Sequence, residues 1–391
     1  MKKKIAILGS TGSIGCTTLE ILKKNKNSFH VELLSTNKNI KKILDQSTFF
    51  KVKNIIIYDK KKYLYLTNQK KLNKINIYNN VSDYLKYNKK KLDYVMSAIT
   101  GLQGLKPTLD IIKFTKKIAI ANKESIICGW SLIKRELKKY DTKFSPVDSE
   151  HFSILELIKN EDKKDIKNVF LTASGGPFLK TKIKNLKKIT PKKAIDHPTW
   201  KMGKKISVDS ATLINKVFEL IEAQKIFDFD IKKIKIIVQP TSYVHGIVEF
   251  NNGITKFLSH PTSMLIPIYN SLFDKKNDSF RFEKLDFSKL NNLNFIKIDK
   301  NKFPIEQIIK QIPNTDSLFE TILISANDKL VDLFLKKKIS FNEIYIILNK
   351  ILKLSEYRKY KKIKPKKLKQ ILDLDHIVRL KTQSLSVKSS L

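Results

Sequence analysis

The sequence predicts an α/β protein that begins with a doubly wound parallel sheet. Short apolar segments, which are typical of buried strands, alternate with helical patterns as far as residue 121. The first such segment, Ile5–Leu8, runs into a glycine-rich turn and then into a helical pattern, which is the order that a dinucleotide-binding turn requires. This order predicts a Rossmann-like domain over residues 1–150. Further strands are expected at 31–35, 54–58, 93–99, 117–121 and 169–172.

The rest of the chain predicts three further parts. Residues 151–273 are expected to form a central α/β catalytic domain, in which a basic stretch near 174–205, interrupted by prolines, acts as a flexible lid. The polar and irregular segment 274–300 indicates a linker. Over residues 301–391 the apolar side chains recur at helical spacing, which predicts a small C-terminal helical bundle. The tail 381–391 is expected to be disordered.

The charge is the most unusual feature of the composition. The 391 residues include 77 Lys+Arg and 37 Asp+Glu, a formal net charge of +40. Such an excess is typical of nucleic-acid-binding proteins. However, lysines occur in every region, arginine is scarce, and aromatic residues do not alternate with basic ones as a stacking surface requires. We therefore expect no specific nucleic-acid partner.

Other compositional features bear on location. No apolar run reaches the roughly 18 residues of a membrane-spanning helix. The two cysteines, Cys16 and Cys128, are too few for a disulfide framework and lack metal-ligand spacing. We expect a cytoplasmic protein without a membrane segment.

The glycine-rich turn and the end of the next strand together predict the cofactor. The glycines at 9, 12 and 15 depart from the commoner Gly-x-Gly-x-x-Gly spacing, but they still let the backbone approach a pyrophosphate at a helix N-terminus. After the second strand come Asn37, Lys38 and Asn39, where an NAD-binding protein would carry an acidic residue for the ribose 2′-hydroxyl. A lysine between amides suits a 2′-phosphate and predicts NADP. The alternative is a lysine in a lysine-rich loop.

The stretch 205–219 is expected to carry the centre of the site. Residues 205–208 predict a short strand, and a helix is expected to follow with Asp209 or Ser210 as its N-cap. The first turns of a helix attract anions through free N–H groups and the helix dipole. Glu219 would add a metal ligand on the same helix. The predicted phosphate contacts are Ser210, Asn215 and Lys216. An ordinary capped surface helix is the alternative.

Two more acidic residues lie in a second segment. If the chain is extended there, Asp148 and Glu150 point to the same side. Two carboxylates so placed suit a hard divalent cation, and Glu219 would supply a third oxygen. The alternative is a helix N-terminus with an Asp cap and a Glu in the first turn; Ser149 is the expected cap. His197, close in sequence to Trp200, is a candidate substrate contact.

Six motifs resemble the 1-deoxy-D-xylulose 5-phosphate reductoisomerase family, an NADPH-dependent family of the non-mevalonate isoprenoid pathway. They occur in the family's order and cover about residues 3–250. The motifs are Gly9-Ser-Thr-Gly-Ser-Ile-Gly15, Ala121-Asn-Lys-Glu-Ser125, Pro146-Val-Asp-Ser-Glu-His151, Ser174-Gly-Gly-Pro-Phe178, His197-Pro-Thr-Trp-Lys-Met-Gly203 and Lys205-Ile-Ser-Val-Asp-Ser-Ala211.

The resemblance implies a set of site residues. The implied NADPH contacts are Thr11, Gly12, Ser13, Ile14, Asn37, Lys38, Asn39, Asn122, Glu124 and Gly203. The implied metal ligands, for Mg²⁺ or Mn²⁺ and with Co²⁺ as a further option, are Asp148, Glu150 and Glu219. The implied catalytic and substrate-binding residues are Lys123, Ser149, Glu150, Ser174, His197, Trp200, Ser210, Asn215, Lys216 and Glu219, with Trp200 and Met202 in the lid.

The resemblance also implies the reaction. The family rearranges 1-deoxy-D-xylulose 5-phosphate by retro-aldol cleavage and re-addition and then reduces the aldehyde with NADPH to 2-C-methyl-D-erythritol 4-phosphate. It further implies a homodimer. Two alternatives stay open: a reductase of a related phosphosugar, and a basic nucleic-acid-binding protein that keeps only the fold.

Several positions depart from the family pattern. Asn37 stands where the family has Gly, and the family's His-Pro-Gln-Ser is Gln239-Pro-Thr-Ser242 here, with His245 kept. The family's Gly-x-Pro-Asp-Met-Arg is His260-Pro-Thr-Ser-Met-Leu265 here, which loses the Asp and the Arg, and its Asn-Ala-Ala-Asn-Glu is Ile324-Ser-Ala-Asn-Asp328. None of these is an expected metal or phosphate residue, so we expect them to affect dimer contacts and stability more than chemistry.

Overall fold

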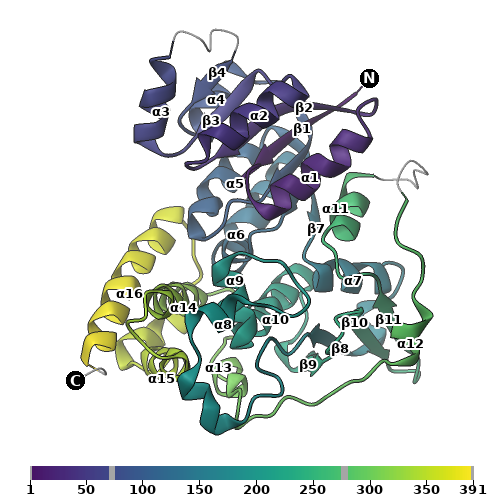
Figure 1. Cartoon of the computed structure of the whole chain (residues 1–391), viewed down its shortest axis with the longest axis vertical. Helices are drawn as coiled ribbons and strands as arrows, with labels where there is room; N and C mark the ends of the chain where they lie inside the picture. The colour runs from purple at the N-terminus through teal and green to yellow at the C-terminus, as the bar shows by residue number, and fades with distance from the viewer. Residues whose placement is uncertain (1, 70–74, 274–280, 389–391) are drawn as a thin grey trace. The chain divides into compact units, whose positions relative to one another are not determined.

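The computed structural model describes residues 2–69, 75–273 and 281–388, and Figure 1 shows the arrangement of the elements. The chain divides into two compact units. Unit 1 comprises Met1–Ile126, Leu132–Phe152 and Met264–Glu283, and unit 2 comprises Ile127–Ser131, Ser153–Ser263 and Lys284–Leu391. Residues 153–263 and 284–391 lie in the same unit. The two units do not test the four-part division expected from the sequence, which stays a prediction.

Unit 1 is built on a seven-stranded sheet in which every strand pair is parallel. The strands are β1 (Lys3–Leu8), β2 (Phe29–Thr36), β3 (Asn54–Ile57), β4 (Asn76–Tyr78), β5 (Leu92–Ser97), β6 (Thr115–Ile120) and β7 (Lys143–Pro146). Their order is β4-β3-β2-β1-β5-β6-β7. Chain order therefore reverses between β1 and β5, which is where ligands bind in doubly wound sheets.

Most helices of unit 1 lie between these strands in the sequence. The helices of this unit are α1 (Ser13–Lys24), α2 (Ile40–Phe50), α3 (Lys60–Thr67), α4 (Val81–Tyr87), η2 (Leu102–Gly104), α5 (Leu105–Ile112) and α11 (Leu265–Leu272), while α6 (Lys123–Tyr140) and α7 (Ser149–Leu157) contribute residues to both units. Of these, α7 follows β7 and α11 comes from a later segment. The inner strands consist almost wholly of buried apolar residues, as expected of parallel strands covered on both faces.

This sheet confirms the predicted Rossmann-like class. The apolar runs that predicted strands correspond to β1, β2, β3, β5 and β6. The two outer strands, β4 and β7, were not expected, because they are three and four residues long and only partly buried.

Unit 2 contains a second, mixed sheet. Its strands are β8 (Ile166–Ala173), β9 (Ile234–Val238), β10 (Val244–Phe250) and β11 (Thr255–Ser259), in the order β11-β10-β8-β9. β8 and β9 are parallel, whereas β10 pairs antiparallel with both β8 and β11. The buried face of this sheet packs against apolar residues of α10 (Ile214–Phe227), including Leu220 and Phe227.

The remaining helices of unit 2 are mostly C-terminal. They are η3 (Lys163–Asp165), η4 (Ile183–Lys188), α8 (Pro191–Ile195), α9 (Lys204–Ala211), η5 (Ile231–Lys233), α12 (Phe287–Asn291), α13 (Ile305–Ile309), α14 (Phe319–Leu335), α15 (Phe341–Leu352), η6 (Ser355–Lys362) and α16 (Leu368–Lys388). α14 contacts both α15 and α16, and Figure 1 shows the three together in green and yellow. The predicted C-terminal helical bundle is confirmed.

Two expectations about local structure are wrong. The tail is not irregular from residue 381, because α16 continues to Lys388; residues 389–391 lie outside the described part of the chain. The segment 205–208 is not a strand but the first half of α9. Its β-branched Ile206 and Val208 favour a strand locally, but burial against neighbouring helices decides the conformation.

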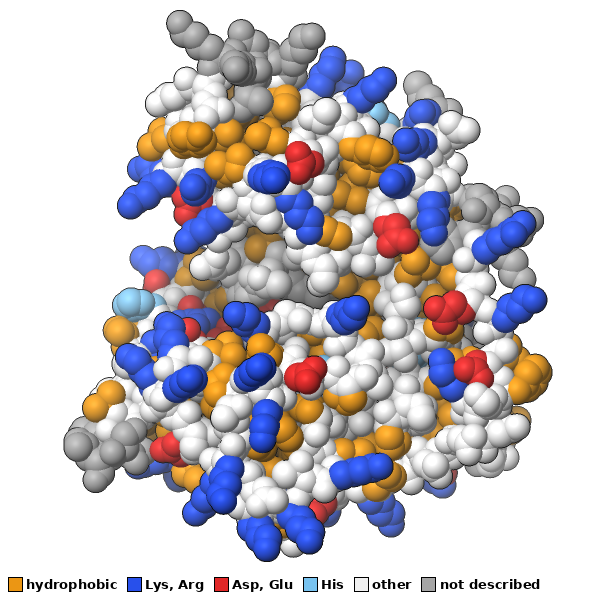
Figure 2. Space-filling view, viewed as in Figure 1, with side chains coloured by type: hydrophobic (Ala, Val, Ile, Leu, Met, Phe, Trp, Pro, Cys, Tyr) orange, Lys and Arg blue, Asp and Glu red, His pale blue; other side chains and the backbone are white. Residues whose placement is uncertain are grey.

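The basic residues are spread out on the face of the molecule that Figure 2 shows. On the face shown in Figure 2, lysine and arginine side chains are distributed across the whole view rather than gathered into one stripe. The described residues on this face therefore form no continuous basic stripe of the kind that a nucleic-acid-binding surface shows. In the described part of the chain, none of the helices has both the length and the apolar composition that crossing a bilayer requires.

Candidate active site

The turn after β1 has the geometry of a phosphate-binding loop. Gly9 has φ +89°, and a Cβ there would lie 2.7 Å from the carbonyl oxygen of Ala98, so only glycine fits. A Cβ on Gly15 would lie 2.4 Å from the carbonyl oxygen of Gly9, which explains the third glycine as a close contact between helix and turn. The Gly9 N–H donates to Ser35 Oγ over 2.8 Å and thereby joins the turn to the end of β2.

A cavity of about 360 Å³ opens beside this turn. Because the family resemblance implies the adenosine end of the cofactor here, we call it the adenosine pocket. It contains five of the predicted cofactor residues: Thr11, Gly12, Asn37, Lys38 and Asn39. Ser13 and Ile14 open α1 immediately after the turn. Asn39 also caps α2, since its side chain accepts the Lys42 N–H. The pocket also contains residues that were not predicted to bind cofactor: Gly9, Ser35, Thr36, Tyr58, Ala98, Ile99, Thr100 and Gln103.

The signal for the missed residues was their position after strands. Tyr58 follows β3, and Ala98–Thr100 follow β5, so they lie at the carboxyl edge of the same sheet as the glycine turn. Residues at that edge are candidates in any doubly wound fold.

Asn122 joins two loops at this edge. It precedes α6, where its Oδ1 accepts the Ser125 N–H over 2.5 Å, and its Nδ2 donates to the carbonyl oxygens of Ile99 and Gly101. Its amide therefore fixes the loop after β5, which lines the adenosine pocket. Glu124, in the first turn of α6, is buried.

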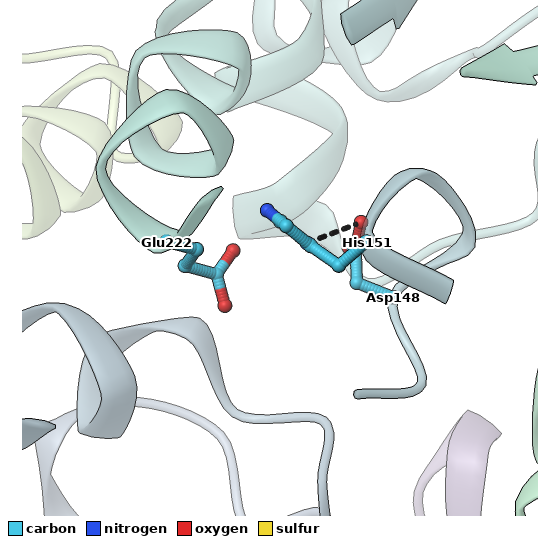
Figure 3. A group of neighbouring side chains, drawn as sticks. All are labelled: Asp148, His151 and Glu222. Carbon is cyan, nitrogen blue, oxygen red and sulfur yellow. Dashed lines mark hydrogen bonds and ion pairs between the residues drawn. The ribbon is translucent and has the colours of Figure 1, made fainter. Parts of the chain in front are cut away.

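The next group in unit 1 is centred on Asp148. Its carboxylate forms an ion pair with Lys123 and lies 3.1 Å from Nδ1 of the buried His151, as Figure 3 shows for the second contact. Burial alone would raise the pKa of Asp148, but the Lys123 ammonium and His151 hold it well below its usual range. The carboxylate is therefore ionised and already faces a cation.

The expectation that Ser149 caps the following helix is wrong. α7 begins at Ser149, and it is Asp148 that accepts the Glu150 N–H with Oδ1, over 3.3 Å, and the Phe152 N–H with its backbone carbonyl, over 2.8 Å. The Ser149 hydroxyl instead donates to Glu150 Oε2 over 2.5 Å. Asp148 thus combines a capping contact with its ion pair to Lys123, each through a different oxygen.

In unit 2 the loop after β8 and the end of α9 meet at one histidine. Nε2 of His197 lies 3.1 Å from Ser174 Oγ and 3.0 Å from Ser210 Oγ. Nδ1 accepts the backbone N–H groups of Thr199 and Trp200, so the neutral ring carries its proton on Nε2. Burial, with a smaller effect of the Lys216 charge, lowers the pKa of His197 to about 4. A neutral N–H donor and two hydroxyls therefore converge on one point.

The junction between α9 and α10 differs from the single capped helix that was expected. Neither Asp209 nor Ser210 is an N-cap; both lie in the last turn of α9, and α10 starts after Leu213, which has φ +57°. A left-handed conformation of a non-glycine residue costs about 1–2 kcal/mol. The buried Leu213 side chain and a hydrogen bond from the Tyr345 hydroxyl to the Thr212 carbonyl hold this junction.

The first turns of α10 carry the predicted anion and metal residues. Asn215 and Glu219 lie on one face, as predicted, because Asn215 Nδ2 donates to Glu219 Oε1. Lys216 forms an ion pair with the other Glu219 oxygen, and both side chains are almost completely buried. The Glu219 carboxylate is thus held by one amide and one ammonium group.

The expected lid segment contributes an aromatic contact. The centroids of the Trp200 and His245 rings are 6.2 Å apart, in an edge-to-face arrangement. The His245 ring also stacks on the His260 ring, with the two centroids 3.7 Å apart. His260 is one of the positions that depart from the family pattern. Gly203 is the N-cap of α9, and a Cβ there would meet no other atom within 4 Å.

Comparison with known proteins agrees with this geometry. Family models described as 1-deoxy-D-xylulose 5-phosphate reductoisomerase, its C-terminal domain and DXP reductoisomerase C-terminal domain match residues 5–129, 144–227 and 258–381. A 1-deoxy-D-xylulose 5-phosphate reductoisomerase of Pelagibacter ubique (strain HTCC1062) is 51% identical over 387 residues, covering 98% of this chain and all of the relative. The chain belongs to the 1-deoxy-D-xylulose 5-phosphate reductoisomerase family.

Solved structures of reductoisomerases have the same fold. The enzyme from Zymomonas mobilis in complex with NADPH is 31% identical and covers 99% of both chains with a TM-score of 0.86. A reductoisomerase in complex with NADPH, fosmidomycin and magnesium is 29% identical, with a TM-score of 0.89 over 99% of this chain and 98% of that one. The departures at 239–242, 260–265 and 324–328 therefore lie within a preserved reductoisomerase fold.

Proposed function

We infer that this chain converts 1-deoxy-D-xylulose 5-phosphate to 2-C-methyl-D-erythritol 4-phosphate, using NADPH and a divalent metal. The observation that carries this inference is the 51% identity to a reductoisomerase along almost the whole chain. Reductoisomerases of the same fold bind NADPH and magnesium. The adenosine pocket and the convergence of His197 with Ser174 and Ser210 would supply two of the parts that the reaction needs.

We propose that NADPH lies along the glycine turn with its adenosine end in the adenosine pocket. Thr11, Gly12, Ser13 and Ile14 would contact the pyrophosphate, whose charge the N-terminus of α1 favours. Asn37, Lys38 and Asn39 would surround the 2′-phosphate. Asn122, Glu124 and Gly203 would complete the site.

We propose Asp148, Glu150 and Glu219 as the metal ligands, for Mg²⁺ or Mn²⁺, with Co²⁺ as a third option. Oxygen-only ligands of this kind suit hard divalent cations. One observation supports a cation beside these carboxylates. Asp148 forms an ion pair with Lys123, and Glu219 forms one with Lys216. A metal ion would stabilise negative charge on the substrate oxygens as a Lewis acid.

Protein groups would bind and orient the substrate phosphate. We propose that Ser174, Ser210 and the Nε2–H of His197 donate to it from one side, since these three groups already converge. Asn215 and Lys216 would also contact the phosphate once the Glu219 carboxylate binds a metal ion instead of these two side chains. Ser149 and Glu150 would contact the sugar hydroxyls.

Lys123 would place a positive charge beside the carbon skeleton that rearranges, and it could exchange a proton there. Trp200 and Met202 would cover the substrate from the segment 174–205, excluding water and keeping the cleaved fragments in place for re-addition. The contact of Trp200 with His245 supports a defined resting place for that segment.

We also propose that the chain is a cytoplasmic homodimer. β11 is the edge strand of the second sheet, and its Phe257 is half exposed, which suits pairing with a second copy. The two free cysteines are compatible with a reducing compartment. Size-exclusion chromatography with light scattering tests the dimer; a monomer at micromolar concentration would contradict it.

The proposed reaction is tested by product analysis. Purified protein, NADPH and Mg²⁺ are incubated with 1-deoxy-D-xylulose 5-phosphate, and the product is identified by NMR together with the NADPH consumed. One methylerythritol phosphate formed per NADPH supports the proposal. A phosphosugar reductase would instead reduce other phosphosugars faster than it turns over the deoxyxylulose phosphate in direct competition.

A further inference from the structure

An acidic residue, Asp59, follows Tyr58 of the adenosine pocket and lies near the pocket's lysine, Lys38. β2 and β3 are neighbouring parallel strands, with Thr36 opposite Ile57, so the turns that follow them lie side by side. Two backbone hydrogen bonds join these turns: Tyr58 N–H donates to the Thr36 carbonyl over 3.0 Å, and Asp59 N–H to the Asn37 carbonyl over 3.2 Å. Asp59 is therefore held beside the segment that faces the ribose.

The Asp59 side chain is fixed by a second role. As the N-cap of α3 it accepts the Lys62 N–H with Oδ1 over 3.0 Å. Its other oxygen, Oδ2, lies 3.7 Å from Nζ of Lys38. The Asp59 side chain is 21% exposed and that of Lys38 is 71% exposed, so the carboxylate is the fixed partner and the ammonium is the one that can move.

The two charges have opposite effects on the coenzyme. In dinucleotide-binding folds a carboxylate at this edge accepts a hydrogen bond from the ribose 2′-hydroxyl of NAD, whereas a basic group accommodates the 2′-phosphate of NADP. Here the basic group follows β2 and the acid follows β3. The Asp59 charge offsets part of the attraction between Lys38 and a 2′-phosphate and also repels that phosphate directly.

We propose that Asp59 sets the selectivity of this protein between NADPH and NADH, by competing with the 2′-phosphate for Lys38 and by offering an acceptor to the 2′-hydroxyl. The proposal rests on the inferred use of NADPH and on Lys38 as its phosphate contact. It makes NADH a weaker second coenzyme of the same reaction, with hydride transferred to the same aldehyde.

The test compares both coenzymes in matched variants. Asp59→Asn removes the charge but keeps a good N-cap, and Asp59→Ser is a second variant with a capping hydroxyl. Asp230→Asn is the control, because Asp230 is also an N-cap aspartate, of η5 in unit 2, and its substitution changes the net charge equally. For each protein, kcat/KM is measured with NADPH and NADH, and dissociation constants of NADP⁺ and NAD⁺ are measured by calorimetry.

We expect Asp59→Asn to raise the NADPH-to-NADH ratio of kcat/KM by about 5- to 50-fold, as removal of one charge near a dianion does at short range. We expect the change to lie in KM and to become smaller at high salt, because salt screens the charges. The affinity of the Asp59→Asn variant for NADP⁺ should rise as well. Lys38→Gln lowers the ratio, and in the Lys38→Gln background Asp59→Asn has a smaller effect. Asp230→Asn leaves the ratio within twofold.

Two results would overturn the proposal. An unchanged ratio in both Asp59 variants, with Lys38→Gln still lowering it, would show that Asp59 is only a helix cap. A lowered ratio would show that Asp59 orients Lys38 for the phosphate instead of competing with it. If Lys38→Gln changes neither affinity, the phosphate contact assigned under the proposed function fails as well, and calorimetry distinguishes this case without any turnover.

Discussion

Nε2 of His197 lies 3.0 Å from the hydroxyl oxygen of Ser210, and this contact joins the expected lid segment to the last turn of α9. The histidine is neutral, because burial and the Lys216 charge lower its pKa to about 4, so it acts as a hydrogen-bond donor without a net charge. The nearby cationic group is Lys216 itself. A substrate phosphate at this point would thus meet both the neutral hydrogen-bond donor, His197, and the cationic group, Lys216.

Replacing Ser210 should weaken substrate binding. Ser210→Ala removes one donor to a charged phosphate, worth about 1.5–3 kcal/mol, so KM for the phosphosugar should rise roughly tenfold to a hundredfold. KM for NADPH should stay the same. Steady-state kinetics with each substrate varied in turn provides the measurement. Ser288→Ala, at the exposed start of α12, serves as the control; equal KM values for Ser210→Ala and wild type would argue against the phosphate role.

The α9–α10 junction should depend on Tyr345. Its hydroxyl donates to the Thr212 carbonyl, one residue before the left-handed Leu213. Tyr345→Phe keeps the ring but leaves a buried carbonyl without this donor, which should lower the free energy of unfolding by about 1–3 kcal/mol. Urea denaturation measures this loss. The loosened junction should also raise KM for the phosphosugar, and an unchanged KM would separate the junction from substrate binding.

A buried ion pair should hold α10 against α14. Lys225 Nζ lies 2.8 Å from Glu320 and 2.7 Å from Asp316, and both Lys225 and Glu320 are almost fully buried. Lys225→Met leaves buried carboxylates without their cation and should cost about 3–5 kcal/mol. The double variant Lys225→Met/Glu320→Leu should lose less than the sum of the single variants in a double-mutant cycle.

The exposed pair of Lys24 and Glu20 is the matched control for this cycle. Its atoms are 3.8 Å apart, and both side chains are more than half exposed. Lys24→Met should change the free energy of unfolding by less than about 1 kcal/mol. Strict additivity of the two buried substitutions would rule out the coupling.

Stability should fall in acid because of His260. Burial, and then the neighbouring His245, lower the pKa of His260 to about 3. Since this lies below the ordinary value of 6.5, protonation favours the unfolded chain. The contribution of neutral His260 to the free energy of unfolding is complete above pH 6.5. It is lost at about 1.4 kcal/mol per pH unit as the pH falls from 6.5 toward 3. Thermal unfolding of wild type and His260→Gln from pH 7 to pH 5 should show a shallower slope for the variant.

Equal slopes for wild type and His260→Gln would mean that other groups account for the acid sensitivity.

Sequence reasoning was most reliable where burial and periodicity agree. β1 and β5 each end in four consecutive buried residues, most of them apolar, as is typical of a parallel strand covered on both faces. The pairing of Asn215 with Glu219 was also predictable, because residues four apart on a helix face one another.

The missed features depend on contacts between distant segments. Ile206 and Val208 favour a strand, and only their packing in unit 2 makes them helical. The left-handed Leu213 has no sequence signal, because a leucine adopts that conformation only when its surroundings impose it. Asp59 was missed because its significance depends on β3 lying beside β2, which spacing along the chain does not reveal.

One comparison tests directly whether Glu219 is a ligand of a catalytic metal. NADPH oxidation with 1-deoxy-D-xylulose 5-phosphate is followed as Mg²⁺ is titrated into wild type and into Glu219→Gln, after removal of metal with EDTA. We predict that EDTA abolishes turnover, that Mg²⁺ restores it in wild type, and that Glu219→Gln loses at least about 10²-fold in kcat while it still binds NADPH. Wild-type turnover and wild-type Mg²⁺ dependence in Glu219→Gln would contradict the account.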